Sequence, residues 1–257
     1  MNKGWDPQQY LKFAGPRLRP ALDLLGRIDV SAAKTVYDIG CGPGNLTQFL
    51  QGRWPDAEII GVDNSAGMLE RAREAHPSAS WLQADLTSWR PETPADVIYA
   101  NAALQWVDGH ETLFPALMQS LAEGGVLAVQ MPRNHAAPSH ALMQDAIEAS
   151  PWADAMRGAR SLPPVPGPEV YYDLLQPLAG ALDIWETEFL QVLEGDNAVA
   201  EYTRGTALKP YLDALADDDQ RKAFFDDYSA RVQKAYPKRA DGKTLFPFRR
   251  LFIVAKR

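Results

Sequence analysis

The segment VYDIGCGPGN at residues 36–45 places three glycines on alternate positions directly after a strand-like apolar run. Glycine has no Cβ, so it adopts left-handed backbone conformations and lets other groups approach the main chain closely. A helix-like segment follows, with Leu46, Phe49 and Leu50 at helical spacing. The order strand, glycine turn and helix predicts the first unit of an α/β sheet, with a ligand beside the turn.

Short apolar strands and helices continue to alternate through the first half of the chain. Strands are expected at 35–39, 58–62, 80–84, 96–100 and 126–131. The helix before the last of these strands is expected to stop at Gly124 and Gly125. This alternation is typical of a parallel sheet covered by helices on both faces.

Composition narrows the class of protein. The 257 residues carry a net charge of −7 without a basic block, so nucleic acid is not an expected partner. One cysteine, Cys41, and four scattered histidines predict neither a disulfide nor a metal site. No apolar run reaches the roughly 18 to 20 residues of a membrane span, so no membrane partner is expected. The N-terminus has no signal-peptide pattern, and a cytoplasmic location is therefore expected.

Two acids follow the glycine turn at the ends of the next two expected strands. Asp63 is placed to accept the two hydroxyls of a ribose, and Asp85 to accept an adenine amino group. The dinucleotide pattern G-x-G-x-x-G fails at Asn45 or Thr47, and no phosphate loop with Gly-Lys-Ser/Thr occurs. The combination predicts an adenosine cofactor without phosphate groups.

Each of these features also has a purely structural explanation. Three glycines fit tight packing between a strand and a helix. Asp63 fits the start of a turn with Asn64, and Asp85 fits a helix cap.

Four segments carry a resemblance to a known family: VYDIGCGPGN, IIGVDNS, WLQADL and ADVIYANAALQWV. Over residues 35–131 they resemble the ordered motifs of class I S-adenosylmethionine-dependent methyltransferases. The resemblance implies a Rossmann-like, seven-stranded, mostly parallel sheet with an antiparallel last strand, helices on both faces and helical lid insertions. FPFRRLFIVAKR at residues 246–257 fits that last strand.

We accordingly expect one methyltransferase domain over residues 1–257, with a cofactor-binding core at about 30–132. Helical cap segments are expected at 133–182 and 194–244, and closing strands at 183–193 and 246–256.

The resemblance implies S-adenosylmethionine as cofactor, with S-adenosylhomocysteine as product. In it, the glycine turn lies beside the methionine moiety, Asp63 holds the ribose, and Asp85 frames the adenine with Leu86. The cofactor-binding residues so predicted are Asp38, Gly40, Cys41, Gly42, Asn45, Asp63, Asn64, Met68, Asp85, Leu86 and Asn101. Met68 packs on the adenine ring in this interpretation, and its alternative is a place in the core.

Four longer segments extend the resemblance over nearly the whole chain: YLKFAGPRLRPALDLLGRI, NAALQWVDGHETLFPALM, GGVLAVQMPRN and FPFRRLFIVAKR. They are similar to members of this family that esterify a small tricarboxylic acid such as trans-aconitate. A carboxylate is ionised at neutral pH, so its methylation needs alignment but no general base. We therefore predict no catalytic acid or base. Arginine pairs well with carboxylates, and Arg19 and Arg250 are the candidates we favour. The predicted substrate-binding residues are Arg19, Gln105, Trp106, His110 and Arg250.

Three other functions stay open at this point. One is methylation of a malonyl thioester or another small molecule, and a second is non-catalytic nucleoside binding. A nicotinamide dehydrogenase is disfavoured by the misplaced third glycine. The oligomeric state is not predicted, and a monomer is plausible.

Overall fold

The computed structural model describes residues 18–159 and 163–257, and these fall into two compact units. Unit 1 takes its described residues from the stretches Met1–Pro132, Val165–Thr187 and Arg250–Arg257. Unit 2 takes them from Arg133–Pro164 and Glu188–Arg249. The expected single domain, with its cap segments and closing strands, stays a prediction.

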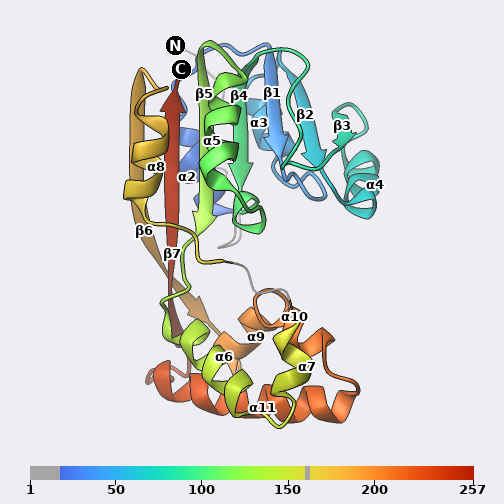
Figure 1. Cartoon of the computed structure of the whole chain (residues 1–257), viewed down its shortest axis with the longest axis vertical. Helices are drawn as coiled ribbons and strands as arrows, with labels where there is room; N and C mark the ends of the chain where they lie inside the picture. The colour runs from blue at the N-terminus through green and yellow to red at the C-terminus, as the bar shows by residue number, and fades with distance from the viewer. Residues whose placement is uncertain (1–17, 160–162) are drawn as a thin grey trace. The chain divides into compact units, whose positions relative to one another are not determined.

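Seven strands form one sheet in the order β3-β2-β1-β4-β5-β7-β6 (Figure 1). Their bounds are β1 Thr35–Ile39, β2 Glu58–Asp63, β3 Ser80–Gln83, β4 Ala95–Asn101, β5 Leu121–Pro132, β6 Ala181–Leu193 and β7 Thr244–Lys256. The pairs β1–β2, β1–β4, β2–β3 and β4–β5 are parallel, whereas β5 and β7 are antiparallel. The predicted mostly parallel, seven-stranded sheet with an antiparallel last strand is thus confirmed.

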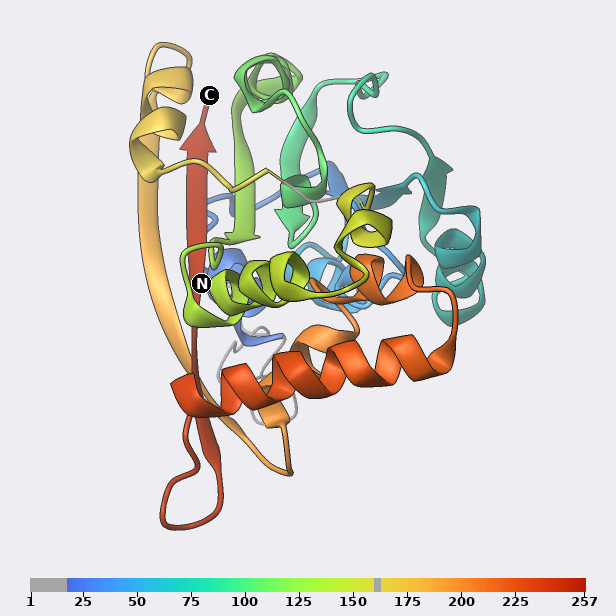
Figure 2. The ribbon, with the colours of Figure 1, turned by 60° about the horizontal axis from the view of Figure 1, so that its bottom comes forward.

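Chain order reverses at β1, which has β2 on one side and β4 on the other. In open α/β sheets, ligands bind beyond the carboxyl ends of the strands at such a reversal. The helices of unit 1 are α2 Arg19–Gly26, α3 Thr47–Arg53, α4 Ala66–Ala75, the short 3₁₀ helix η1 Leu104–Trp106, α5 His110–Gln119 and α8 Pro168–Leu175. Helices α5 and α8 lie on one face of the sheet, and α2 and α3 on the other (Figures 1 and 2).

Burial on both faces explains why the inner strands read as continuous apolar runs. Val36 and Ile39 of β1, Val97 and Ile98 of β4 and Val129 of β5 are all at most 2% exposed. The side chains of α5 and α8 extend this core, since Phe114 and Tyr171 are fully buried and their ring centroids lie 4.8 Å apart.

The helix α5 ends at Gln119, and the expectation that it continues to Gly124 and Gly125 is wrong. Leu121 already pairs with Ala95 of β4, and the register then shifts at a bulge before Val97. Gly124 has a φ of +75°, and a Cβ on Gly125 would lie 2.7 Å from the backbone oxygen of Ala95. The two glycines therefore serve a bulged strand start, not a helix end.

Unit 2 is built mainly from helices, whose apolar faces meet in a core of their own. These helices are α6 Pro138–Ala149, α7 Ala153–Arg157, α9 Ala198–Arg204, α10 Lys209–Asp213 and α11 Asp218–Ala235. The long helix α11 buries Phe224 and Tyr228 against the neighbouring helices α6 and α9. Among the described helices of both units, none has the length and apolar character of a membrane span.

The bulge gives a prediction on stability. Gly125→Ala is expected to lower the free energy of unfolding by about 1 to 3 kcal/mol, because the new methyl group would overlap backbone atoms that cannot move aside. Gly26→Ala is the control, since nothing lies within 4 Å of a Cβ at that helix end and alanine favours helix by about 1 kcal/mol. Urea unfolding of the two variants tests this, and equal stability would contradict it.

Candidate active site

The three glycines of the turn after β1 all have left-handed φ values, +69° at Gly40, +56° at Gly42 and +78° at Gly44. A Cβ on Gly40 would lie 2.3 Å from Ala103 Cβ, and one on Gly44 would lie 2.6 Å from the Trp81 ring. At Gly42, by contrast, a Cβ would meet nothing within 4 Å. Packing thus explains Gly40 and Gly44, whereas Gly42 faces open space where a ligand can approach the backbone.

Asp63 ties the end of β2 to this turn. Its Oδ2 accepts a hydrogen bond from the Gly42 N–H and its Oδ1 one from the Ser65 N–H, both at 2.9 Å. The Gly40 N–H adds a 2.7 Å bond to the Val62 carbonyl. A carboxylate oxygen accepts more than one hydrogen bond, so Asp63 keeps acceptor capacity for a diol. The turn-forming and ligand-binding interpretations of Asp63 are therefore compatible.

Asp38 is a buried acid in the middle of this region, on β1 beside Tyr99 of β4. Its side chain is 2% exposed, and Oδ2 has no hydrogen-bond partner among the described residues. Burial, followed by the charge of Asp63, raises the pKa of Asp38 to about 7. Burial also raises the pKa of the Cys41 thiol far above its usual range, so Cys41 is not a thiolate nucleophile at neutral pH.

Two more buried acceptor atoms lie at the end of β4 and just after it. Asn101 Oδ1 and Gln105 Oε1 have no hydrogen-bond partner in the described part of the chain. Gln105 is held by a 2.8 Å bond from its Nε2 to the carbonyl of Ala102, a non-glycine residue with a φ of +52°. Buried acceptors without donors are costly, and three of them, counting Asp38, suit a ligand that carries positive charge or N–H groups.

Asp85, Leu86 and Met68 were predicted to surround the adenine. Asp85 is exposed, and its Oδ1 accepts bonds from the N–H and the hydroxyl of Thr87, which lower its pKa. Leu86 is 8% exposed and belongs to the core. Met68 is 40% exposed on α4, so its alternative place in the core does not apply in this structure.

The other predicted cofactor residues lie at the same strand ends. Cys41 is buried within the glycine turn, and Asn45 follows the turn on the surface. Asn64 is exposed, and its carbonyl accepts a 3.2 Å bond from Gln83 Nε2.

The predicted substrate residues have diverse surroundings. His110 is buried, with Nδ1 at 2.7 Å from the Tyr171 hydroxyl and Nε2 at 2.9 Å from the Leu104 carbonyl. Both ring nitrogens thus contact protein groups, which suits positioning of η1 against α5 and α8, and the predicted contact of His110 with the substrate stays a prediction. Trp106 is 45% exposed.

The two favoured arginines also differ. Arg19 is exposed at the start of α2, with Nε 3.8 Å from Asp23. Arg250 is buried in β7, where Nη1 donates to Gln130 Oε1 at 3.2 Å. Three further candidates near the N-terminus lie outside the described residues: Tyr10 and Phe13, whose rings could cover a cofactor, and Arg17, which could bind a carboxylate.

Sequence reasoning missed Ala102 and Ala103. They place the chain after β4 against the glycine turn, Ala102 by its left-handed φ and Ala103 by its contact with Gly40. The only sequence signal is the pair of small residues in NAALQW, which reads equally well as a short helix.

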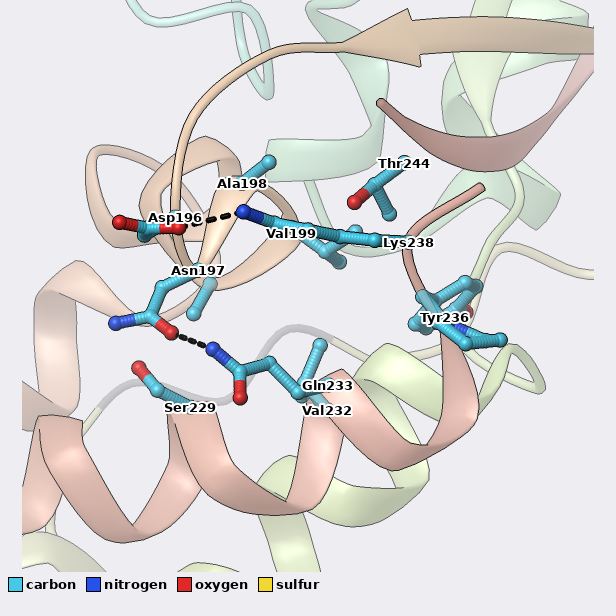
Figure 3. A pocket seen from close by; sticks show the side chains of 12 residues that line it. Asp196, Asn197, Ala198, Val199, Ser229, Val232, Gln233, Tyr236, Lys238 and Thr244 are labelled. Atoms are coloured by element: carbon cyan, nitrogen blue, oxygen red, sulfur yellow. Dashed lines mark hydrogen bonds and ion pairs between the residues drawn. The ribbon is translucent and has the colours of Figure 1, made fainter. Parts of the chain in front are cut away.

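A cavity of about 390 Å³ lies in unit 2 and contains none of the predicted site residues (Figure 3). An Asp196–Lys238 ion pair of 2.5 Å crosses it, and Gln233 donates to Asn197 beside it (Figure 3). These polar side chains satisfy one another.

Strand order, glycine turn and strand-end acid together fit the arrangement of a class I S-adenosylmethionine-dependent methyltransferase. A family model described as "Methyltransferase domain" matches residues 36–125. Proteins called trans-aconitate 2-methyltransferase match almost end to end. The one from Azoarcus sp. is 52% identical and that from Afipia carboxidovorans 48%, each over 98% of this chain and 99% of the relative. The chain belongs to the trans-aconitate 2-methyltransferase family, and the predicted membership and enzyme class are confirmed.

Solved structures agree on the fold. The YcgJ protein from Bacillus subtilis aligns with a TM-score of 0.58 at 15% identity, over 92% of this chain and 97% of that one. A Haemonchus contortus phosphoethanolamine N-methyltransferase 2, in complex with S-adenosyl-L-methionine, aligns with a TM-score of 0.54 at 16% identity, over 93% and 52%.

The buried acid gives a prediction on pH. The raised pKa means that folded protein holds a proton on Asp38 between about pH 4 and 7, where the unfolded chain has lost it. Without ligand, this contribution to stability is therefore present at low pH and is lost as pH rises toward 7, by a few kcal/mol. In Asp38→Asn, the free energy of unfolding is expected to change much less with pH. Urea unfolding of both proteins at pH 5 to 8 measures it, and parallel pH profiles would contradict the prediction.

Proposed function

We propose that this protein transfers the methyl group of S-adenosylmethionine to a carboxylate of trans-aconitate or a closely related small polycarboxylic acid, forming the monomethyl ester. One observation carries the proposal within the structure: the three unpartnered acceptors Asp38, Asn101 and Gln105 at the carboxyl ends of β1 and β4. These three atoms can accept hydrogen bonds from the ammonium group of an amino acid moiety. The family to which the chain belongs indicates the methyl acceptor, a small polycarboxylic acid.

The residues present fit the cofactor. Asp63 would hold the ribose with its remaining acceptor capacity, and Gly42 would allow the methionine moiety to lie against the backbone. Met68 offers an exposed apolar surface for the adenine. When bound, S-adenosylmethionine supplies an electrophilic methyl group on a positively charged sulfur.

Methylation of the substrate carboxylate needs no proton transfer. A bond forms between a carboxylate oxygen and the methyl carbon, the carbon–sulfur bond breaks, and its electron pair stays on sulfur. No base is required because the carboxylate is already ionised at neutral pH. The bound nitrogens of His110 and the high pKa of Cys41 agree with a site that orients its reactants.

We retain a cytoplasmic location and the absence of a nucleic-acid partner as predictions, and the oligomeric state stays unpredicted.

The proposed reaction is tested directly on the purified protein. Incubation with S-adenosylmethionine and trans-aconitate is expected to give a monomethyl ester, detected by mass spectrometry and cleaved by mild base to methanol. Malonyl thioesters and amines serve as comparison acceptors. Turnover on these alone, or on no acceptor, would refute the proposal.

Cofactor binding is tested at Asp63. Asp63→Asn replaces one acceptor oxygen by an amide NH₂ that faces a backbone N–H, so the turn and the ribose contact are both weakened. The Kd of S-adenosylhomocysteine is expected to rise by about 10- to 100-fold. Glu58→Gln is the matched control at the opposite, exposed end of β2 and is expected to leave the Kd unchanged. Calorimetry measures both, and equal Kd values would contradict the assignment.

A further inference from the structure

We propose that Gln130 binds the carboxylate of the amino acid moiety of the cofactor, and that Arg250 is a positioning residue that orients the Gln130 side chain. The inference rests on the proposed function, because it names a further residue that would hold the proposed cofactor. Gln130 lies near the carboxyl end of β5, and both residues belong to unit 1.

Gln130 presents a buried donor in a fixed orientation. The residue is fully buried, and its Oε1 accepts a 3.2 Å bond from Arg250 Nη1. A guanidinium group has donors only, so the atom that it contacts must be the amide oxygen. The other atom, Nε2, is therefore the N–H group, and it has no hydrogen-bond partner among the described residues. Such a buried donor costs free energy, which a ligand oxygen would recover.

The donor lies beside an acceptor on the neighbouring strand. Gln130 of β5 pairs with Asn101 of β4 in parallel register, and residues paired in this way direct their side chains to the same face of a sheet. Asn101 Oδ1 is also buried without a partner in the described chain, so it does not bond to Gln130 Nε2. A single ligand that offers both a donor and an acceptor would satisfy both atoms.

The same face carries an acid and a cation on either side of this pair. Asp38 of β1 pairs with the residue two positions before Asn101. Arg250 of β7 pairs with the residue two positions after Gln130. Side chains alternate along a strand, so residues two apart share a face. Across the strand order β1-β4-β5-β7, the row therefore runs from a carboxylate through two amides to a guanidinium.

This order of charges matches an α-amino acid. Its ammonium and carboxylate groups are attached to one carbon atom, so acceptors and donors at adjacent positions are needed to bind both. The ammonium is favoured beside Asp38 and Asn101, whose buried acceptor atoms have no donor in the described part of the chain. The carboxylate is favoured at Gln130 Nε2, on the side of the row nearer the Arg250 charge. The acceptor acid has no ammonium group, so the row fits the cofactor.

The first test is Gln130→Glu, which keeps an oxygen for Arg250 and replaces the Nε2 donor by a second carboxylate oxygen. The Kd of S-adenosylhomocysteine is expected to rise by about 10- to 100-fold, because the new oxygen repels the ligand carboxylate. Gln191→Glu is the matched control. Gln191 is a buried strand glutamine of unit 2 whose Nε2 donates to the Tyr202 hydroxyl at 3.3 Å, and its substitution is expected to leave the Kd unchanged.

A ligand without the carboxylate separates recognition from general damage. Decarboxylated S-adenosylhomocysteine keeps the ammonium group, and the unsubstituted protein is expected to bind it about 10- to 100-fold more weakly than S-adenosylhomocysteine. Gln130→Glu and the uncharged variant Gln130→Met should abolish most of this difference. A merely structural role would raise both Kd values equally, so an unchanged ratio of the two Kd values in both variants would overturn the inference.

The acceptor acid also carries carboxylates, and steady-state kinetics distinguish the two sources. At saturating S-adenosylmethionine, the KM of trans-aconitate is expected to be the same in Gln130→Met as in the unsubstituted protein. A rise in this KM without a rise in the Kd of S-adenosylhomocysteine would assign Gln130 to the acceptor and refute its contact with the cofactor.

A measurement on the unsubstituted protein does not depend on variant folding. The Nε2 protons of Gln130, assigned through its backbone, are expected to shift in the NMR spectrum with S-adenosylhomocysteine and much less with the decarboxylated ligand. Equal shifts with both ligands, or none, would contradict the inference. If the protein binds S-adenosylhomocysteine but methylates no carboxylic acid, the proposed function fails, and the two Kd values still decide the role of Gln130. If it methylates trans-aconitate and the Kd ratio is unchanged, only the role of Gln130 fails.

Discussion

The close contact of three strand ends around Gly40 is the constraint on which the site of unit 1 depends. The turn after β1 packs against Ala103, which follows β4. Hydrogen bonds to the Val62 carbonyl and to the Asp63 carboxylate of β2 hold the turn in place. Any side chain at Gly40 would separate these ends, and the acceptors of Asp38, Asn101 and Gln105 would lose their common setting. The backbone contact at Gly40 thus determines where the polar atoms at these strand ends lie.

Both units contain buried polar atoms without a hydrogen-bond partner among the described residues. In unit 1, buried acceptors on Asp38, Asn101 and Gln105 and a buried donor, Gln130 Nε2, have no partner among the described residues, and in unit 2 Asn134 Nδ2 is a buried donor without one. A reaction between a sulfonium and a carboxylate needs both kinds of recognition. Unit 1 alone contains both kinds of group, since Gln130 Nε2 is a buried donor and Asp38, Asn101 and Gln105 carry buried acceptors.

Apolar periodicity predicted the sheet and the position of Asp63 at the end of β2, because that pattern reflects burial directly. The start of β5 was missed, since a bulge at Gly124 and Gly125 depends on pairing with Ala95, which lies far away in the sequence. His110 and Arg250 show the same limit. Their bonds to Tyr171, Leu104 and Gln130 follow from tertiary packing, while their substrate contacts stay predictions. Single-sequence patterns do not contain such contacts.

Asp38 links stability to ligand binding. A buried carboxylate without a hydrogen-bond donor on one oxygen destabilises the free protein, and the raised pKa is the expression of that cost. A cationic ligand beside it would stabilise the ionised form, so binding would release a proton from the fraction of Asp38 that is protonated near pH 7. A ligand that relieves this destabilisation of the unliganded protein therefore gains affinity from doing so. The buried Asp38 thus has two consequences in this chain. It lowers the stability of the unliganded fold, and it favours a positively charged ligand.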